Sequence, residues 1–286
     1  MTIHEAMLRR LTEAHGNVQS IEPLGGKSGA SVYRLRFAET SRIVKQTTSS
    51  AEQLFYTHVA PILRANDIPL PEVEVILPDG WIALEDIPNP LPRELWHGDS
   101  RLVEILARLH RLKMEIPPLQ EGYSPKWDDA LTAKMLACFE PETARELQPR
   151  LRDIQHESQS LFEPQCWISG DPNPTNWGVR HDGSLVLFDW DRFTRATPAV
   201  DLAIIVGGLG NRQQFTEVAG TYIRKREELG DSYSQTADAL GHSIAIAKVW
   251  VVVEYLSLYT DGALEADSML DALSSQFAPW LDSLIE

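Results

Sequence analysis

A short polar stretch in the middle of the chain places the strongest constraint on its fold. The segment 168–176 holds an acid, Asp171, and an amide, Asn176, in a loop rich in Gly and Pro. A second acid, Asp189, comes thirteen residues after Asn176 and directly follows the apolar run 185–188. A tight loop followed by a strand brings such side chains to one point, and oxygen ligands suit Mg²⁺. The sequence therefore predicts a loop and a strand that share one polar site.

The order acid, amide, acid is the layout that a phosphoryl-transfer site needs. One carboxylate faces the attacking hydroxyl, while the amide and the other carboxylate hold the Mg²⁺ ions that bridge the nucleotide phosphates. Gly, Pro, Asn and Asp also dominate turns for backbone reasons alone, so a solvated turn is the alternative interpretation. The partner acid and the features upstream favour the catalytic interpretation.

The chain of 286 residues is strongly acidic, with a formal net charge of −15. This charge argues against a nucleic acid or an anionic membrane as a partner, because both would repel it. Residues 1–88 carry 8 Lys and Arg against 11 Asp and Glu, and residues 89–286 carry 18 against 30. A cationic substrate would complement the acidic C-terminal part, although acidic surfaces also simply aid solubility.

No feature of the sequence predicts a secreted or membrane-bound protein. Cys138 and Cys166 are the only cysteines, too few for a disulfide scaffold, and the N-terminus has no apolar core of a signal peptide. The longest apolar stretches, 202–209 and 249–258, are too short or too interrupted to span a bilayer. We expect a cytoplasmic protein that is a monomer or a homodimer.

The N-terminal third has the pattern of a small antiparallel sheet with two helices. Apolar periodicity predicts helices over residues 4–15 and 51–65. Strands are expected over residues 18–24, 31–37, 42–47, 73–77 and 81–84, with the Gly-rich residues 25–29 at the first hairpin tip. A Pro-rich crossover at residues 86–92 marks the boundary between a lobe of residues 1–88 and a lobe of residues 89–286.

The second lobe is predicted to be larger and mostly helical. Helices are expected over residues 101–112, 130–139, 142–162, 198–209, 213–229, 235–260 and 267–285, and the sixth can break near Gly241. The fold class is therefore α+β, with a small antiparallel-sheet N-lobe and a helical C-lobe.

Lys45 lies near the end of the third expected strand, on the face opposite to Val44. An inward lysine is costly unless it is paired. Glu52, in the first turn of the next helix, can supply the partner and leave the ammonium to reach nucleotide phosphates. The alternative is an edge-strand lysine that faces water.

These residues and five further motifs carry a family resemblance. The motifs are Leu84-Glu85-Asp86, Leu109-His110, Gly170-Asp171 with Asn176, Asp189-Trp190-Asp191, and Pro198-Ala199-Val200-Asp201-Leu202-Ala203. Together they resemble the aminoglycoside phosphotransferase and choline kinase-like family, which has a two-lobed protein-kinase-like fold. The resemblance implies ATP as the phosphoryl donor, with GTP as an alternative, and Mg²⁺ as the metal.

The resemblance implies a role for each matching residue. Asp171 would orient the substrate hydroxyl as the catalytic residue, and Asn176 and Asp189 would ligate Mg²⁺. Asp191 would order the metal loop and is also a substrate-binding candidate. The cofactor-binding candidates, which include backbone groups of the hairpin tip and the crossover, are Gly25, Gly26, Ser28, Gly29, Lys45, Glu52, Glu85 and Ile87.

The sequence departs from the family pattern at Ser169, where the family usually has His before Gly-Asp. That His is chiefly a scaffold residue, so the proton-accepting carboxylate of Asp171 keeps its expected role. Asp201 is expected to pair with the catalytic loop, and His110 to be a packed helix residue. Asp-Phe-Gly and Ala-Pro-Glu motifs are absent from the sequence, which argues against a protein kinase.

The expected partner is a small-molecule acceptor with a hydroxyl and a positive charge, such as an aminoglycoside or a cationic peptide antibiotic. Trp250, Glu254 and Asp261 recur on one late helix and its end, where they can hold an ammonium by charge and cation–π contact. Core packing of the Trp is the alternative. The alternative functions are a metabolic kinase of an amino alcohol, sugar or amino acid, and a catalytically silent nucleotide-binding protein of the same fold.

Overall fold

The computed structural model describes residues 3–24, 31–47, 50–115, 122–262, 264 and 268–285. Contacts divide the chain into two compact units. The first, here called the sheet unit, comprises Met1–Leu91, Met114–Tyr123 and Thr175–Arg192. The second, the helical unit, comprises Pro92–Lys113, Ser124–Pro174 and Phe193–Glu286. The expected assignment of nucleotide binding to residues 1–88 and of acceptor binding to residues 89–286 stays a prediction.

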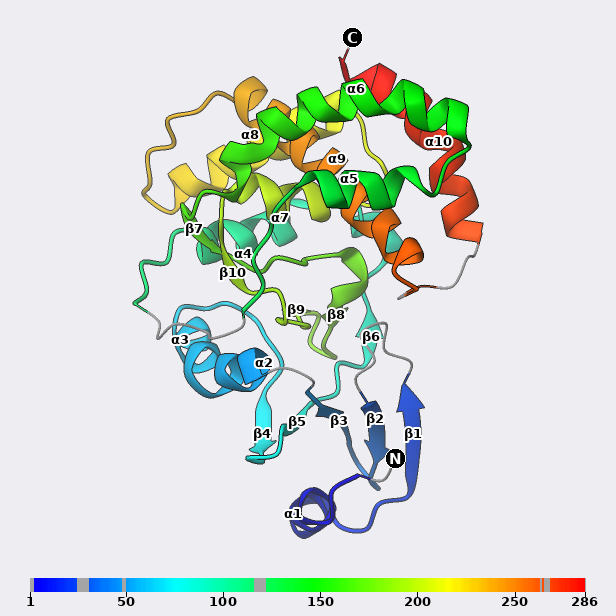
Figure 1. Ribbon diagram of the computed structural model, residues 1–286. Coiled ribbons are helices and arrows are strands. Elements are labelled where there is room, and N and C mark those ends of the chain that lie inside the picture. Colours follow the sequence, from blue (N-terminus) through cyan, green and yellow to red (C-terminus); the bar gives the residue numbers. More distant parts are fainter. Residues whose placement is uncertain are drawn as a thin grey trace. The chain divides into compact units, whose positions relative to one another are not determined.

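A five-stranded antiparallel sheet forms the core of the sheet unit, in the order β1-β2-β3-β5-β4 (Figure 1). Its strands are β1 (Ser20–Leu24), β2 (Ser31–Arg36), β3 (Ser41–Gln46), β4 (Val73–Ile76) and β5 (Trp81–Glu85). Side chains alternate between the two faces of a strand, and Leu35 and Val44 share one face. They pack there with Met7 and Leu11 of α1 (Glu5–His15). Lys45, the neighbour of Val44, consequently points to the opposite face.

The helical segment after β3 begins with the residue that pairs with Lys45. It consists of α2 (Ser50–Leu54), the π-helical turn η1 (Phe55–Val59) and α3 (Ala60–Ala65). The extent agrees with the expected helix over residues 51–65, but the π turn was not predicted. A π turn widens the helix locally and occurs often at functional sites.

A three-stranded sheet completes the sheet unit, in the order β6-β8-β9. It consists of β6 (Asn89–Pro90), β8 (Trp177–Val179) and β9 (Leu185–Leu187). Leu91 N donates to Trp177 O at 3.3 Å, and Leu187 N donates to Pro69 O at 3.0 Å. These backbone bonds attach the residues before Asp189 to the crossover and to the segment before β4.

The helical unit has the helices that periodicity predicted, with most ends shifted by a few residues, and a short turn, η2 (Arg93–Leu95), that was not predicted. The helices are α4 (Ser100–His110), α5 (Asp129–Leu136), α6 (Pro141–Glu157), η3 (Ser158–Phe162), α7 (Pro198–Ile204), α8 (Arg212–Glu228), α9 (Ala237–Thr260) and α10 (Ser268–Ile285). A small antiparallel pair, β7 (Cys166–Ile168) with β10 (Thr194–Ala196), flanks the segment that carries Asp171. The strand β10 was not predicted.

Helix α9 is the central helix of this unit and is apolar over most of its length. Among the described residues it is the one helix with the length and composition to cross a membrane, yet 67% of its most apolar window is buried inside the protein. It packs against α5, α7 and α8. The expected break at Gly241 is wrong, because α9 continues through it. A Cβ at Gly241 would lie 2.9 Å from Thr216 Oγ1 of α8, so glycine allows the two helices to approach closely.

The helix expected over residues 198–209 is wrong in its extent, because α7 ends at Ile204. The following residues pair with a distant segment instead. Val206 forms a bridge with His97, and Gly207 N donates to Trp96 O at 2.7 Å. Lys248 Nζ, from α9, donates to Ala203 O at 3.1 Å and to Val206 O at 2.6 Å. These bonds satisfy the carbonyl groups that the end of a helix leaves without partners.

Candidate functional site

Lys45 lies at the centre of a cluster of three carboxylates in the sheet unit. Its Nζ lies 2.8 Å from Glu52 Oε1, 3.3 Å from Asp191 Oδ2 and 3.5 Å from Asp189 Oδ1. The side chain of Lys45 is 12% exposed and that of Glu52 is 3% exposed. The expected pairing of Lys45 with Glu52 is therefore present, and it extends to both acids of the Asp189-Trp190-Asp191 motif.

Burial and the repulsion between carboxylates shift the pKa values of the groups in this cluster. Burial raises the pKa of the Glu52 carboxyl, Lys45 opposes this effect, and the nearby Asp191 adds to it. Burial also raises the pKa of Asp189, again against the attraction of Lys45. The pKa of Lys45 is raised as well, because the three carboxylates outweigh the effect of its burial. Among the described residues three carboxylates thus face Lys45, and the raised pKa values of two of them favour a proton or a further cation at the site.

The loop that carries the two acids has an unusual backbone conformation. Asp189 has a φ of 64°, in the left-handed region that residues with a side chain seldom adopt. Such a conformation persists only where the surroundings hold it, and it is frequent at functional sites. Here the ring of Trp190 stacks on Phe55 at 5.0 Å, and its Nε1 donates to Leu187 O at 3.0 Å. The packed indole of Trp190 thus fixes the residue that separates Asp189 from Asp191.

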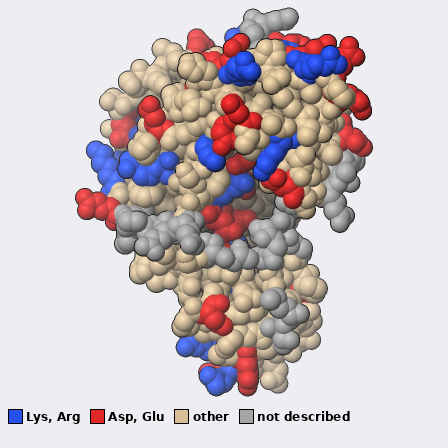
Figure 2. All heavy atoms as spheres, viewed as in Figure 1, with Lys and Arg blue, Asp and Glu red and all other residues tan. Residues whose placement is uncertain are grey.

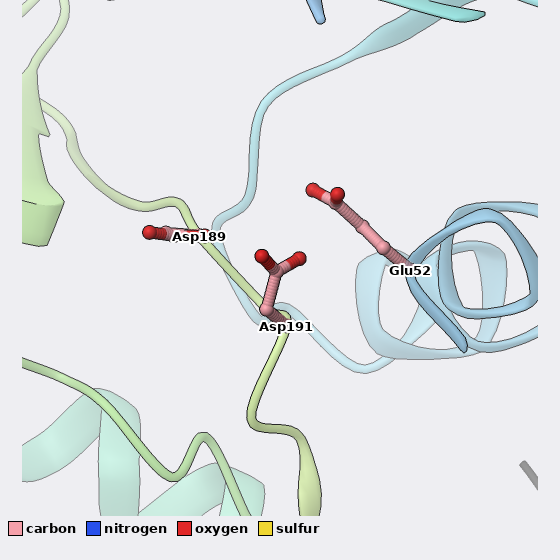
Figure 3. A group of neighbouring side chains, drawn as sticks. All are labelled: Glu52, Asp189 and Asp191. Carbon is pink, nitrogen blue, oxygen red and sulfur yellow. The ribbon is translucent and has the colours of Figure 1, made fainter. Parts of the chain in front are cut away.

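The donor atoms of this cluster fit a magnesium ion. One carboxylate oxygen each from Glu52, Asp189 and Asp191 lies within 4.8 Å of the others, and Figure 3 shows the carboxylates of Glu52 and Asp191 directed toward one another. Asp189 Oδ1 is buried without a hydrogen bond in the described part of the chain. Phe188 N donates to Asn176 O at 2.9 Å, so Asn176 is attached beside the residue that precedes Asp189. Oxygen donors of these types suit Mg²⁺.

The crossover is held by ion pairs that the sequence did not indicate. Arg180 donates to both carboxylate oxygens of Glu85, at 2.7 and 2.8 Å. Arg34 donates to both oxygens of Asp86, at 2.7 and 3.0 Å. Bidentate pairs of this kind orient both partners. A Cβ at Gly178 would lie 2.5 Å from Ile87 Cγ2, so the side chain of Ile87 packs directly on the backbone of β8.

The loop that carries Asp171 is anchored within the helical unit by Asp201. Oδ2 of Asp201 accepts a hydrogen bond from Ser169 N at 2.8 Å, and Oδ1 accepts one from Gly170 N at 2.9 Å. Asp201 is fully buried, and His110 Nε2 lies 3.1 Å from its Oδ2. The expected pairing of Asp201 with this loop is confirmed, and so is the position of His110 as a packed helix residue. Asp171 itself is half-buried and directly follows the two anchored amides.

Ser169, which stands where the family usually has His, is fully buried. In the described part of the chain its Oγ has no hydrogen-bond partner. Its backbone N–H still donates to Asp201. The departure from the family pattern therefore leaves the anchoring of the loop backbone in place.

The expected ammonium-binding face on α9 needs a correction. The indole of Trp250 is fully buried, its Nε1 donates to Lys126 O at 3.0 Å, and its ring packs edge-on against Phe162. A ring with no exposed face cannot hold a cation from solvent, so the core interpretation is the correct one. Glu254 is half-buried. Asp261 pairs with Lys134 at 2.9 Å, so its charge is already balanced.

Acidic groups on the surface of the helical unit are interspersed with basic ones on the face shown in Figure 2. Arg150 with Asp282 and Lys126 with Asp128 are examples of such pairs. On that face the acidic groups are therefore mixed with basic ones. The remaining cofactor-binding candidates, Gly25, Gly26, Ser28 and Gly29, lie outside the described residues.

Comparisons with known proteins agree with this geometry. Residues 20–237 match the model of a family described as the phosphotransferase enzyme family. A comparison with curated protein sequences found no match.

Several solved structures resemble the whole chain. One is spectinomycin phosphotransferase, APH(9)-Ia, in complex with ADP and spectinomycin, which is 15% identical over 100% of this chain and 96% of that chain, with a TM-score of 0.65. Another is choline kinase LicA from Streptococcus pneumoniae, 16% identical over 98% of this chain and 99% of that chain, with a TM-score of 0.62. A choline/ethanolamine kinase family protein from Mesorhizobium loti is 15% identical over 99% of this chain and 94% of that chain, with a TM-score of 0.66.

At these identities the structural likeness shows the fold. The predicted α+β fold of the protein-kinase-like type, with an N-terminal antiparallel sheet and a largely helical C-terminal part, is confirmed.

Proposed function

The chain belongs to the phosphotransferase enzyme family and is a small-molecule kinase of that family; from this premise we propose that it transfers the γ-phosphate of ATP, with Mg²⁺, to a hydroxyl of a small cationic molecule. The observation that carries the proposal is the buried Lys45–Glu52 ion pair next to Asp189 and Asp191. A lysine held by a helix glutamate beside a metal-binding acid is the arrangement that phosphoryl transfer from a nucleotide uses.

Each residue has a defined task in the proposed reaction. Lys45, oriented by Glu52, would contact the nucleotide phosphates. Asn176 and Asp189 would hold Mg²⁺, which supplies positive charge to the phosphates when it is bound. Asp171 would accept a hydrogen bond from the acceptor hydroxyl and orient its oxygen toward the γ-phosphorus. Phosphoryl transfer asks little covalent chemistry of a protein, so positioning and charge neutralisation carry the catalysis.

We assign the acceptor to the cationic antibiotics, either aminoglycoside-like molecules or basic peptides, and the physiological role to resistance in the cytoplasm. Support comes from the net charge of −15, most of it in residues 89–286. A negative field of this kind raises the local concentration and the association rate of a polycationic acceptor, even where acidic and basic side chains are interspersed. Spectinomycin phosphotransferase, which this chain resembles over its full length, acts on an antibiotic according to its name.

A metabolic kinase of an amino alcohol is the second candidate. The observation that favours it is an aromatic pair on α9, Tyr255 and Tyr259, with ring centroids 5.7 Å apart and an interplanar angle of 83°. Both residues are half-buried, and Glu254 precedes the pair. Aromatic rings can hold a quaternary ammonium group through cation–π contact. An inactive nucleotide-binding protein is the remaining alternative from the sequence.

A coupled ADP-release assay with a panel of acceptors tests the proposal. The panel pairs aminoglycosides and basic peptide antibiotics with choline, ethanolamine, homoserine and simple sugars, each with ATP and with GTP. Turnover with an antibiotic, together with resistance of an expressing host, supports the first candidate. Turnover confined to choline or ethanolamine supports the second. ATP binding without turnover on any acceptor would favour the inactive protein.

A further inference from the structure

The anchoring of the Asp171 loop does not end at Asp201 and His110. The other ring nitrogen of His110, Nδ1, lies 3.1 Å from the hydroxyl of Tyr222. Arg226 Nη1 donates to the same hydroxyl at 2.7 Å, and Arg226 Nε donates to Asp231 at 2.9 Å. A continuous series of polar contacts therefore runs from Asp231 to the backbone amides before Asp171.

The chemistry of the groups fixes which atom donates in each contact between Arg226 and Asp201. The Asp201 carboxylate accepts, so the proton between it and His110 belongs to Nε2 of the ring. In the neutral ring Nδ1 then has a lone pair and accepts from the hydroxyl of Tyr222. The oxygen of that hydroxyl accepts from Arg226, which only donates. Each donor thus has one acceptor, and the ring of His110 is fixed in a single tautomer.

Burial makes this series of hydrogen bonds rigid. Tyr222 and Asp201 are fully buried and His110 is 3% exposed. In such surroundings each hydrogen bond is stronger than in water, and neighbouring bonds polarise one another. Its members come from α8, α4 and α7, so three helices are joined to the loop after β7. Tyr222 and Arg226 are four residues apart and lie on one side of α8.

We propose that Tyr222 and Arg226 are positioning residues that hold the Asp171 loop in its reactive place, acting through His110 and Asp201. The inference rests on the proposed function, because it takes Asp171 to be the catalytic acid. Neither residue belongs to the motifs of the sequence, and neither touches the acceptor or the nucleotide in this account. Their contribution is to restrict the backbone at Ser169 and Gly170.

The test compares Tyr222→Phe with Tyr233→Phe. The first variant keeps the ring and removes the hydroxyl from the series. The second removes a hydroxyl from the adjacent ring, which packs edge-on against Tyr222 at 5.4 Å and is not part of the series. We expect amide hydrogen exchange at Ser169 and Gly170 to accelerate on the order of tenfold in Tyr222→Phe, the equivalent of one hydrogen bond. Tyr233→Phe should leave it unchanged.

Turnover and spectroscopy give the second readout. In Tyr222→Phe we expect kcat, counted per folded molecule, to fall about tenfold with the KM for ATP unchanged. Nitrogen NMR of His110 should show the tautomer protonated at Nε2 in both proteins, because Asp201 still accepts from Nε2, and a shifted Nδ1 resonance in the variant, where Nδ1 has lost its donor. Arg226→Met should accelerate exchange at Ser169 and Gly170 as Tyr222→Phe does, and Arg226→Lys should restore most of the protection of these amides. The two Arg226 variants replace Tyr222→Phe in the test if that variant folds poorly.

Unchanged exchange at Ser169 and Gly170 in both Tyr222→Phe and Arg226→Met would overturn the inference, whatever the activity. Accelerated exchange with a normal kcat would overturn the positioning role as well. Exchange is measured without a substrate, so failure of the proposed function would appear separately, as a wild type that transfers no phosphate.

Discussion

Replacing Lys45 with Met removes the one cation that three carboxylates share. At separations of 2.8, 3.3 and 3.5 Å and an effective dielectric constant of about 20, each attraction amounts to about 5–6 kcal/mol. The cost of burying the charges offsets most of this sum. Removing one partner of a buried ion pair costs about 3–5 kcal/mol in practice, because the remaining charge is left uncompensated. Glu52, at 3% exposure, is such a charge. We therefore expect Lys45→Met to lower the free energy of unfolding by about 3–5 kcal/mol at a pH above the folded pKa of Glu52, where that carboxylate is charged.

The loss should depend on pH in a defined direction. Burial and Asp191 already raise the pKa of Glu52, and removal of Lys45 raises it further. An acid whose pKa is higher in the folded state binds a proton on folding. Its protonated form therefore supports the fold at low pH, and this support is lost as the pH rises through the folded pKa. Below the folded pKa of Glu52 in the wild type, about 8, the two proteins share this loss, and above it the variant should lose about 1.4 kcal/mol per pH unit more than the wild type.

Urea unfolding, followed by tryptophan fluorescence at a series of pH values, measures both effects. Glu52→Gln and the double variant complete a double-mutant cycle, in which the double variant should cost less than the sum of the single ones. Lys134→Met is the matched control, because its pair with Asp261 is about half exposed and should contribute less than about 1 kcal/mol. A Lys45→Met variant as stable as the wild type at pH 10, or additive costs of the two substitutions, would refute the reasoning.

Three further predictions concern the metal, a buried lysine and a helix contact. Asp189→Ala should abolish productive Mg²⁺ binding, and a Mg²⁺ titration of turnover that matches the wild type would contradict the ligand assignment. Burial lowers the pKa of Lys248 to about 7, so between about pH 7 and pH 10 the unfolded state binds more protons at this lysine, which contributes a rise in stability of about 1.4 kcal/mol per pH unit. Lys248→Met should lack this slope in urea unfolding, and parallel curves for the two proteins would contradict the account. Gly241→Val should destabilise the fold by about 1–3 kcal/mol in the same assay, because its Cβ would lie 3.0 Å from Thr216 Cα; a stability equal to the wild type would show that the two helices adjust without cost.

The Lys45–Glu52 pair could be predicted because both residues have local signals. Alternation within β3 places Lys45 opposite the buried Val44, and a helix that begins a few residues later offers Glu52 as the nearest acid. Asp201 could be predicted through its motif. In each case a short stretch of sequence determines which way the side chain points.

No local pattern in the sequence indicates the contacts between distant segments. Arg180 is 95 residues from its partner Glu85 and lies just beyond the end of a three-residue strand. Trp250 was assigned to a binding face because Glu254 and Asp261 share its helical spacing. Helix α9 is buried on nearly every side, however, so spacing alone cannot tell its surface from its core. The π turn after Glu52 likewise follows from packing rather than from any residue pattern.

Phosphoryl transfer by the wild type and by Asp171→Ala is the most direct test of the central claim. Each protein is incubated with ATP, Mg²⁺ and the acceptor panel, ADP release is followed continuously, and the phosphorylated acceptor is identified by mass spectrometry. We predict one phosphorylated hydroxyl with the wild type, and with Asp171→Ala a kcat lowered by about 10²-fold or more while ATP binding is retained. Near wild-type turnover of Asp171→Ala, or no transfer by the wild type to any acceptor with ATP or GTP, would contradict the account.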